Sequence, residues 1–213
     1  MSESLLRDQI CEIGYQMAAG GLVVATEGNI SARPEEDRIL ITPSGVSKGN
    51  LRPEDLIVTD LTGEPLEKHS GTPSSEFRLH VAIYAQRPDC QAIVHAHPPY
   101  ATAFSMSEID MLSLATVEAS AVLGKVCWVA FAWPGTDEMP REIRPLAKHH
   151  KTFLLAHHGA VTLGKSVQDA FHRMQTLERT AQIAWLADFL PGRSDLSTEI
   201  QSELTKRFHH GDL

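Results

Sequence analysis

Short apolar segments alternate with amphipathic helical segments along this chain, and this alternation limits the fold more than any other feature. Helical spacing of apolar residues predicts the helices 4–19, 74–86, 137–148, 166–189 and 196–208. Short apolar runs bounded by turn residues predict the strands 38–42, 56–60, 92–97, 126–131 and 152–156. Strands interspersed with helices predict an α/β or α+β domain. We expect Ser4 to cap the first helix, and Ser74 or Ser75 to cap the second.

The length and composition are those of a folded globular protein. The chain has 213 residues, of which 42% are hydrophobic and 22% are charged, and this composition excludes disorder, collagen and coiled coil as the main state. At roughly 150 residues per domain, the chain forms one large domain or two small ones. Its formal net charge is −8 and it has no Lys/Arg run. A nucleic-acid role is therefore not expected, because phosphate backbones require a cationic surface.

Three features favour the cytoplasm. The apolar stretch 119–133 contains Lys125 and is shorter than the ~20 residues of a membrane-spanning helix. The N-terminal segment carries acidic residues where a signal peptide has basic residues followed by an apolar run. Cys11, Cys90 and Cys127 are far apart and odd in number, which is typical of free thiols in a reducing compartment. We therefore expect a cytoplasmic protein without a membrane partner.

Histidine is the residue used most unusually, with eleven in one short chain. The pair His95-Ala96-His97 closes the predicted strand 92–97, and side chains two apart on a strand face the same side. Both imidazoles can therefore reach one metal ion at the ~2.0–2.1 Å of a Zn–N bond. On its own, the pair is equally compatible with two polar residues at the end of a strand.

A third candidate ligand lies in His157-His158-Gly159, directly after the apolar run 153–156. Adjacent strand residues face opposite sides of a sheet, so only one of the two histidines is expected to bind a metal. The residues alone leave this choice open. The other histidines lie in loops, on helices or in the tail, and are interpreted as solvated or structural.

Glu76 is the carboxylate that would complete such a site for hydrolytic or lyase chemistry. It lies at the start of the predicted helix 74–86, where a negative charge interacts favourably with the helix dipole. The alternative is an ordinary capping-turn glutamate. His80 lies one turn further on the same face, where it orients Glu76 or the helix.

Three short segments combine glycine or small residues with hydroxyl groups: TEGNIS at 26–31, TPSG at 42–45 and TPSS at 72–75. Glycine allows backbone N–H groups to approach an anion, and the third segment opens a helix, whose N-terminus attracts anions. Each segment alone is an ordinary turn or cap. Their grouping just before the candidate metal site indicates a phosphorylated substrate.

The order of the segments GNIS, ITPSG, SSEFRLHVAIYAQRPD, AIVHAHPPYATAFS and LLAHHGAVTLG resembles the class II aldolase/adducin family over nearly the whole chain. Within that family the chain is most similar to bacterial fuculose-1-phosphate aldolases. The resemblance implies an α/β class II aldolase fold in a single domain over residues 1–213. This fold has three α/β/α layers and a central, mainly antiparallel sheet. It also implies a homotetramer of fourfold (C4) symmetry with zinc sites near the subunit interfaces.

The family's functional residues carry over onto matching positions of this chain. The resemblance implies zinc ligands at His95, His97 and His158, because the family ligand directly precedes the glycine. It implies that Glu76 is the catalytic acid/base. It implies phosphate binding by the residues of the three small-residue segments, namely Gly28, Asn29, Ser44, Gly45, Ser74 and Ser75.

The chain departs from the family at one functional position. Fuculose-phosphate aldolases use a tyrosine from the neighbouring subunit on the aldehyde half of the substrate, and the corresponding position here is Thr116. Tyr100, Glu118 or a water molecule takes over that role, or the aldehyde differs. The departure puts fuculose 1-phosphate itself in doubt as the substrate.

The expected activity is that of a zinc-dependent (class II) aldehyde-lyase that cleaves a ketose 1-phosphate to dihydroxyacetone phosphate and an aldehyde. Zinc would act as a Lewis acid and Glu76 as general acid/base. The alternatives within the family are methylthioribulose- or deoxyribulose-phosphate aldolases, dehydratases, 4-epimerases and sugar-acid phosphate decarboxylases. The epimerases carry Asp in place of Glu76, and non-catalytic adducin-like binding heads lack the metal ligands. A zinc hydrolase on a TIM barrel would need ~250 residues.

Overall fold

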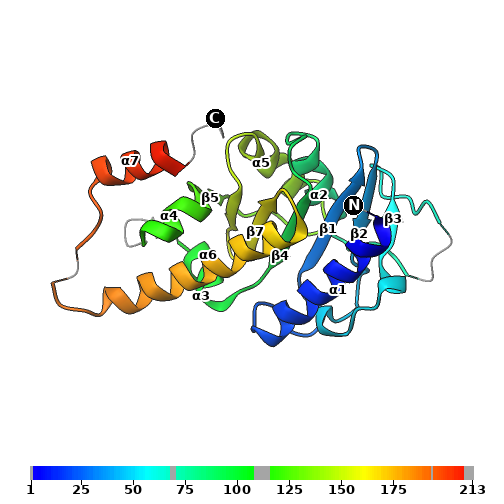
Figure 1. Ribbon diagram of the computed structural model, residues 1–213, viewed down its shortest axis with the longest axis horizontal. Coiled ribbons are helices and arrows are strands. Elements are labelled where there is room, and N and C mark those ends of the chain that lie inside the picture. The colour runs from blue at the N-terminus through cyan, green and yellow to red at the C-terminus, as the bar shows by residue number, and fades with distance from the viewer. Residues whose placement is uncertain (1, 68–70, 108–115, 193, 209–213) are drawn as a thin grey trace.

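A seven-stranded sheet organises the computed structural model, which describes residues 2–67, 71–107, 116–192 and 194–208 (Figure 1). Its strands are β1 (Asn29–Glu35), β2 (Arg38–Ile41), β3 (Ile57–Thr59), β4 (Ala92–Ala96), β5 (Val126–Val129), β6 (Thr152–Leu155) and β7 (Gly159–Gly164). Their order across the sheet is β3-β2-β1-β4-β7-β6-β5. Neighbouring strands are antiparallel except β5 and β6, which are parallel. The expected α/β class and mainly antiparallel sheet are confirmed.

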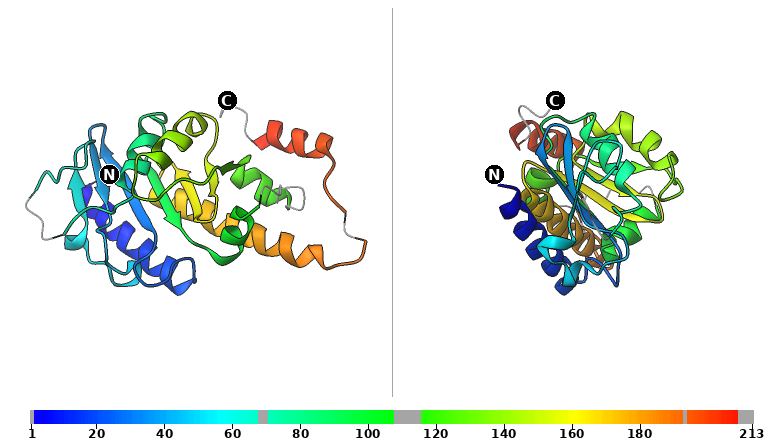
Figure 2. Two further views of the ribbon diagram at one scale, coloured as in Figure 1. Left: turned by 180° about the vertical axis from the view of Figure 1, so that it is seen from behind. Right: turned by 90° about the vertical axis from the view of Figure 1, so that its right-hand side faces the viewer.

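Helices cover both faces of the sheet, as the end-on view of Figure 2 shows. The helices are α1 (Glu3–Ala19), α2 (Phe77–Tyr84), α3 (Pro99–Ser105), α4 (Val117–Leu123), α5 (Glu138–Ala147), α6 (Val167–Asp188) and α7 (Thr198–Phe208). Alternate residues of each strand contribute to two separate cores. On β4, Val94 packs with α1 and α6 on one side, whereas Ile93 packs with α2 and α5 on the other. Strands buried on both faces explain why the predicted strands are continuous apolar runs.

Most predicted elements lie within a few residues of the observed ones, and four observed elements had no prediction. Strand β1 contains Pro34 and polar residues, and β7 begins and ends with glycine, so neither has the composition of a typical strand. Helix α4 is short and follows undescribed residues. Helix α3 begins within the Pro98-Pro99 pair, which does not resemble the start of a helix in the sequence. Pro99 in fact opens α3, because proline fits the first position of a helix.

Two predicted caps were wrong. Ser2, not Ser4, caps α1 by accepting a hydrogen bond from the backbone N–H of Leu5. Helix α2 begins at Phe77 with Glu76 at its N-cap position, rather than at Ser74 or Ser75. The N–H of Ser74 donates to the carbonyl oxygen of Thr42 at 3.2 Å, and the carbonyl oxygen of Ser74 accepts from the N–H of Phe77 at 3.0 Å, so residues 74–76 form a turn before the helix. The hydroxyl of Ser74 nevertheless accepts from the N–H of Glu76 at 3.3 Å.

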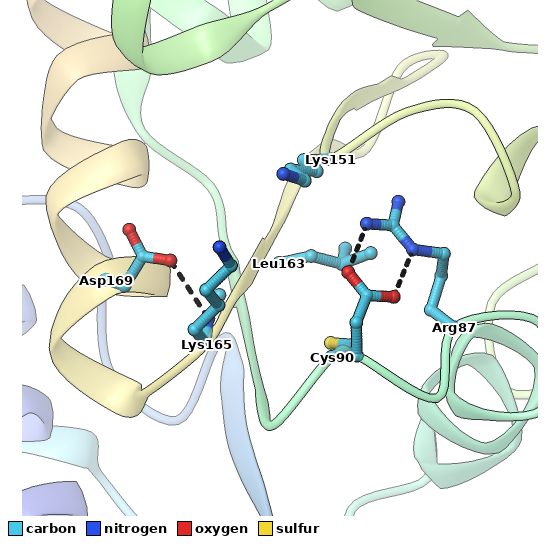
Figure 3. Close-up of a pocket in the computed structure, with 8 residues that line it drawn as sticks. Arg87, Cys90, Lys151, Leu163, Lys165 and Asp169 are labelled. Atoms are coloured by element: carbon cyan, nitrogen blue, oxygen red, sulfur yellow. Dashed lines mark hydrogen bonds and ion pairs between the residues drawn. The ribbon is translucent and has the colours of Figure 1, made fainter. Parts of the chain in front are cut away.

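A small hollow at the start of β4 and the end of β7 is lined by charged residues that pair with one another (Figure 3). Arg87 makes two hydrogen bonds of 2.7 Å to the carboxylate of Asp89. It also donates to the carbonyl oxygen of His150, in the connection before β6. Asp169 accepts from the backbone N–H of Lys165 at 2.9 Å. The contact between Arg87 and His150 joins the segment after α2 to the connection between α5 and β6.

Helices α6 and α7 extend away from the sheet at one end of the molecule (Figure 1). Among the described residues, the helices fall short of the length and apolar character that crossing a bilayer requires. Cys11, Cys90 and Cys127 carry free thiols. Of the histidines interpreted as solvated or structural, His69, His209 and His210 lie outside the described residues.

Candidate metal centre

Strand β4 places His95 and His97 on one side of the sheet. His95 is the fourth residue of the strand, fully buried, and pairs in register with Asn29 of β1 and Val161 of β7. His97 lies one residue beyond the end of the strand, which ends at Ala96 rather than at the predicted residue 97. The backbone N–H of His97 donates to the carbonyl oxygen of Leu22, which fixes the chain as it leaves the sheet.

A tight connection between β6 and β7 delivers His158. Leu155 and Gly159 pair across the two antiparallel strands, so only three residues make the turn. His157 adopts the left-handed conformation with φ of 56°, which is rare for a residue other than glycine. As a result His157 is exposed, whereas His158 faces the other two histidines. The choice within the doublet, which the residues alone left open, is thus consistent with His158.

Gly28 and Gly159 allow strands β1 and β7 to approach β4, the strand that carries His95. A Cβ at Gly159 would lie 2.5 Å from the carbonyl oxygen of Ala96 and 2.6 Å from a ring carbon of His97. A Cβ at Gly28 would lie 2.7 Å from the carbonyl oxygen of His95, and Gly28 also has a φ of +69°. Real Cβ atoms do not come this close, so both positions require glycine.

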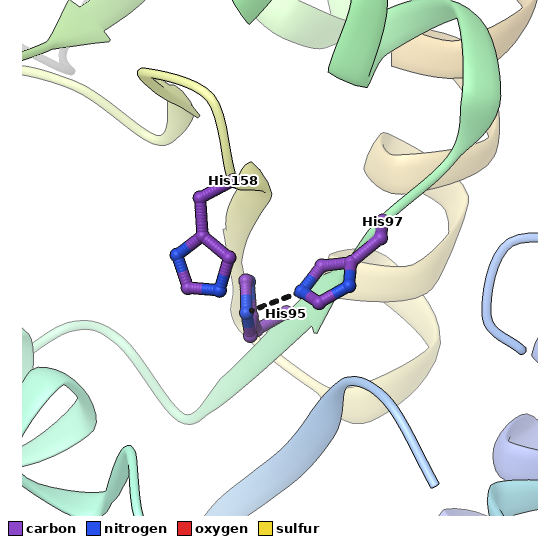
Figure 4. Close-up of side chains that lie close together, drawn as sticks. All are labelled: His95, His97 and His158. Carbon is purple, nitrogen blue, oxygen red and sulfur yellow. Dashed lines mark hydrogen bonds between the residues drawn. The ribbon is translucent and has the colours of Figure 1, made fainter. Parts of the chain in front are cut away.

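The three imidazoles form a compact cluster (Figure 4). Each pair of ring centroids is 4.9 Å apart, and one ligand nitrogen of each ring lies within 4.8 Å of the others. The Nε2 atoms of His95 and His97 are 3.2 Å apart. Glu76 adjoins the cluster, with Oε2 at 3.0 Å from Nε2 of His95 and Oε1 at 3.4 Å from Nε2 of His158.

The positions of the protons show that this cluster suits a cation. His95 donates from Nδ1 to the carbonyl oxygen of Ala160 at 2.9 Å, and Nδ1 of His97 lies 3.3 Å from the carboxylate of Glu27. A neutral imidazole has one N–H, so both Nε2 atoms then present lone pairs to each other and to Glu76. A proton on Nε2 of His95, donated to Glu76 at 3.0 Å, or a metal cation between the rings would satisfy this arrangement. Three imidazole nitrogens with a carboxylate close by are a donor set that suits zinc.

The electrostatics of the cluster point the same way. Burial opposes the charged form of His95, but the carboxylate of Glu76 outweighs it and raises the pKa of His95. Burial, reinforced by the charge of His95, lowers the pKa of His158 to about 4. Burial would also raise the pKa of Glu76, but His95, His158 and a hydrogen bond from Asn29 together lower it well below its usual range. The site therefore holds Glu76 as a carboxylate and favours a single positive charge beside it.

The three small-residue segments converge next to this cluster. Backbone bonds join two of them, since Ser44 donates to the carbonyl oxygen of Thr72 at 2.9 Å and Pro43 forms an isolated bridge with Pro73. The first segment is attached through Ile30, whose N–H donates to the hydroxyl of Thr42 at 3.2 Å. Ser44, Gly45 and Ser75 are exposed, Ser74 is buried and Gly28 is half-buried.

Asn29 differs from the other predicted phosphate-binding residues because it is buried and its amide is already engaged. Its Nδ2 donates to Oε2 of Glu76 at 2.9 Å, and its Oδ1 lies 2.5 Å from Nε2 of His80. The side chain of Asn29 therefore contacts the proposed acid/base.

A buried lysine ties the first two segments together. The ammonium group of Lys48 donates to the carbonyl oxygens of Thr26 and Val46, and the residue is 1% exposed. Burial lowers the pKa of Lys48 to about 8. The sequence analysis did not single out Lys48, and a lone lysine within the stretch 46–50 gives no signal that it is buried.

Thr116, at the position where fuculose-phosphate aldolases have a tyrosine, has a structural role in this chain. The hydroxyl of Thr116 caps α4 by accepting from the N–H of Ala119 at 3.2 Å. Glu118 is exposed in the first turn of the same helix. Tyr100 packs against the hydrophobic core, and its backbone N–H donates to the carboxylate of Glu178 on α6 at 3.1 Å. The contacts described for Thr116, Glu118 and Tyr100 therefore indicate structural roles, and none of them identifies the group that acts on the aldehyde half of the substrate.

Glu27 contacts the histidine cluster, although its position in the sequence gave no sign of this contact. The dipeptide Glu27-Gly28 was read only as part of a glycine-containing turn, yet the carboxylate of Glu27 lies beside His97. A carboxylate against the outer nitrogen of a ligand histidine fixes the orientation of that ring. A sequence signal for this contact is lacking, since it depends on the turn that brings residues 24–28 to the end of β4.

Comparison with known proteins agrees with the fold and the histidine cluster. Residues 8–185 match the profile of the class II aldolase and adducin N-terminal domain. The chain is 33% identical to the 3-oxo-tetronate 4-phosphate decarboxylase of Pectobacterium atrosepticum, over 87% of this chain and 86% of that protein. It is 34% identical to the L-fuculose phosphate aldolase of Methanococcus maripaludis, over 85% of this chain and 96% of that protein.

A solved structure extends this likeness to three dimensions. The crystal structure of YgbL from Klebsiella pneumoniae superimposes with a TM-score of 0.87 at 32% identity, and the match covers 96% of this chain and 99% of that one. The sequence match and the shared architecture both extend over most of the chain, and so the protein belongs to the class II aldolase and adducin family.

Proposed function

We propose that this protein is a metal-dependent lyase that cleaves a ketose 1-phosphate, similar to fuculose 1-phosphate, into dihydroxyacetone phosphate and an aldehyde. The observation that carries the proposal is the position of Glu76, whose carboxylate lies 3.0 Å from His95 and 3.4 Å from His158 of the three-histidine cluster. This arrangement supports the proposal, because carbon–carbon cleavage next to a carbonyl requires a proton carrier beside a cation.

His95, His97 and His158 would hold the metal, and zinc is the ion we propose because it favours imidazole nitrogen. When bound, the ion supplies a Lewis acid that stabilises negative charge on the oxygens of the substrate. The hydrogen bond from His95 to Ala160 and the contact between His97 and Glu27 hold two of the rings in the required orientation.

Glu76 would carry the proton at the carbon that becomes C3 of dihydroxyacetone phosphate. Cleavage of the bond between C3 and C4 leaves an enediolate, and a proton must then be delivered to its carbon. The hydrogen bond from Asn29 to Oε2 at 2.9 Å stabilises the carboxylate form of Glu76, which is the form that accepts the proton in the reverse direction.

The phosphate of the substrate would bind to the residues of the three converging segments. These residues are Gly28, Ser44, Gly45, Ser74 and Ser75, with Asn29 between them and Glu76. Holding the phosphate in place fixes the reacting carbons relative to Glu76 and the histidines. The exposure of Ser44 and Ser75 supports this role, because their hydroxyls are accessible from outside.

A second candidate is the decarboxylation of a 3-oxo-tetronate 4-phosphate, the activity in the name of one relative. Loss of carbon dioxide from that acid leaves the same enediolate of dihydroxyacetone phosphate, so Glu76 would perform the same protonation. Thr116 favours this candidate, because its hydroxyl caps α4 where the aldolases have a tyrosine. Decarboxylation releases no aldehyde and needs no acid/base on that half.

A substrate panel tests the proposal and separates its two forms. The zinc-loaded protein is incubated with ketose 1-phosphates, with 3-oxo-tetronate 4-phosphate and with the unphosphorylated ketoses. A coupled reduction detects the ketone product, which is dihydroxyacetone phosphate from the phosphorylated substrates and dihydroxyacetone from the unphosphorylated ketoses. We expect product from a phosphorylated substrate and little from the unphosphorylated ones. Release of an aldehyde identifies the aldolase, and release of carbon dioxide identifies the decarboxylase. Failure to form dihydroxyacetone phosphate from the whole panel would contradict the proposal.

We also propose that the protein assembles into a homotetramer, as its resemblance to the family implies. Exposed apolar residues near the end of α6 support this, since Trp185, Leu186, Phe189 and Leu190 are each about half exposed or more. Apolar patches of this kind on a folded protein mark interaction surfaces. Light scattering coupled to gel filtration measures the mass, and a monomer at micromolar concentration would contradict this part.

A further inference from the structure

We propose that His80 is a positioning residue for Glu76, acting through Asn29 within a buried chain of hydrogen bonds that ends at Tyr84. The inference rests on the proposed role of Glu76 as proton carrier and adds the residues that hold its carboxylate in place. The chain of contacts runs from Glu76 to Asn29, His80, Ser31 and Tyr84.

Two regular spacings bring these residues together. Asn29 and Ser31 are two apart on β1 and face the side of the sheet that carries α2, since the intervening Ile30 packs on the opposite side. Glu76, His80 and Tyr84 are four apart along α2 and its N-cap, so they form one stripe of the helix. The two sets interleave as the helix lies along the strand.

The protons of this chain have a single consistent arrangement. Burial lowers the pKa of His80 to about 3, so its imidazole is neutral and has one N–H. Asn29 uses Nδ2 to donate to Glu76 at 2.9 Å, and its Oδ1 must accept, so Nε2 of His80 carries the proton. Nδ1 of His80 then accepts from the hydroxyl of Ser31 at 2.7 Å.

Tyr84 completes the chain. Its hydroxyl lies 2.8 Å from that of Ser31, and since Ser31 donates to His80, Tyr84 donates to Ser31. Burial raises the pKa of Tyr84 well above its ordinary value, so the phenol keeps its proton. Every donor in the chain therefore points toward Glu76. The guanidinium of Arg33 lies 4.5 Å from the ring centroid of Tyr84 at the far end.

Burial makes this arrangement rigid. Asn29, Ser31, His80 and Tyr84 are each at most 2% exposed, so water does not replace a broken hydrogen bond. A buried polar group that loses its partner carries the full cost of its desolvation. Reversing one donor would leave a neighbouring group unpaired, so the direction of the whole chain is fixed.

The two carboxylate oxygens of Glu76 therefore have different surroundings and different roles. Oε2 receives the hydrogen bond from Asn29. Oε1 is buried and lies 3.4 Å from Nε2 of His158, and it accepts no hydrogen bond from the described residues. Oε1 can therefore take up and release a proton while the bond to Oε2 stays intact. We assign Oε1 as the proton-carrying atom and the His80 chain as the device that keeps it aimed at the substrate carbon.

The test compares His80→Leu with His80→Gln in the zinc-loaded protein. Hydrogen exchange at C3 of dihydroxyacetone phosphate in heavy water isolates the proton step, because it needs neither an aldehyde nor a carboxylate substrate. We expect His80→Leu to slow this exchange ~10–100-fold, as is typical when a buried supporting partner is removed. KM for dihydroxyacetone phosphate and the metal content should stay near their original values. His80→Gln, which keeps an N–H donor near the position of Nε2, should recover most of the rate.

Two further variants keep the test decisive. Ser31→Ala removes only one hydroxyl from the chain and should slow exchange on the order of tenfold, even if His80→Leu does not fold. His172→Leu is the matched control, because His172 is exposed on α6 and its ring hydrogen-bonds to Gln168 of the same helix, away from Glu76. It should exchange at the original rate. Normal exchange by folded, metal-loaded His80→Leu or Ser31→Ala would overturn the inference.

Glu76→Gln separates this inference from the proposed function. If Glu76→Gln exchanges normally, the proposed function itself fails. If Glu76→Gln is slow while His80→Leu and Ser31→Ala exchange normally, Glu76 is the proton carrier and only the positioning role is wrong.

Discussion

His157 and His158 are neighbours in the chain, yet the left-handed backbone at His157 directs them to different surroundings. His157 is exposed at the turn, and His158 is 13% exposed beside Glu76. The turn spans three residues between the paired Leu155 and Gly159. One strained residue thus brings the third imidazole to the two that β4 supplies.

This difference gives the first prediction, which concerns metal retention. The protein should purify with about one zinc ion per chain, and His158→Ala should lose it because two imidazoles alone bind zinc weakly. His157→Asn should keep the metal, since asparagine tolerates the left-handed conformation. Elemental analysis of the purified variants measures both. Full zinc occupancy in His158→Ala would remove His158 from the ligand set.

The second prediction concerns the carboxylate. Glu76→Gln keeps the shape of the side chain but cannot carry a proton, so turnover should fall ~10²–10⁴-fold. Zinc content should be unchanged, because the three histidines remain. A glutamate that only caps α2 would instead give near-normal turnover with a small change in stability. Steady-state kinetics at matched zinc occupancy distinguish these results.

The sequence predicted the histidine cluster in part, because two of its three members have a local signature. His95 and His97 are two apart at the end of an apolar run, and the geometry of a strand alone places them on one side. The third ligand needed the resemblance to the family, because alternation along a strand does not describe a tight turn. The positive φ of His157, which resolves the doublet, depends on how β6 and β7 pair.

The supporting residues could not be predicted in the same way. The resemblance to the family implied that Asn29 is a phosphate contact. Its burial against Glu76 and His80 depends on how α2 lies along β1. In the sequence, Lys48 has the character of a surface residue. It is buried because the chain folds so that its ammonium group reaches the carbonyl oxygens of Thr26 and Val46. Contacts between elements far apart in the chain leave little trace in local patterns.

The third prediction tests the phosphate cradle. Ser75→Ala should raise KM more than it lowers kcat, if the hydroxyl binds the phosphate equally in the ground and transition states. Inorganic phosphate should compete with the substrate in the original protein and compete less well in the variant. A variant whose KM and inhibition by phosphate match those of the original protein would exclude Ser75 from the cradle.

The fourth prediction concerns Gly159. A methyl group there would overlap the carbonyl oxygen of Ala96 and the ring of His97, and neither can move without disturbing β4. Gly159→Ala should therefore lower the free energy of unfolding by ~1–3 kcal/mol, the usual cost of overpacking. It should also weaken zinc binding, because the displaced ring is a ligand. Chemical denaturation and zinc titration measure the two effects. Original values in both would mean that β7 can move away from β4 at little cost.

The last prediction uses the buried lysine beneath the cradle. Folding lowers the pKa of Lys48 from 10.5 to about 8, so between these values the unfolded chain binds a proton that the folded chain does not. The free energy of unfolding attributable to Lys48 must then rise as the pH increases from about 8 to about 10.5, and be independent of pH below that range. Lys48→Met removes this term, so the stability of the original protein relative to the variant should increase across the same window. Urea denaturation of both proteins at several pH values measures the difference, in which the titrations of all other groups cancel. A difference that stays constant from pH 7 to pH 10.5 would mean that Lys48 remains charged in the folded protein, held by the carbonyl oxygens of Thr26 and Val46.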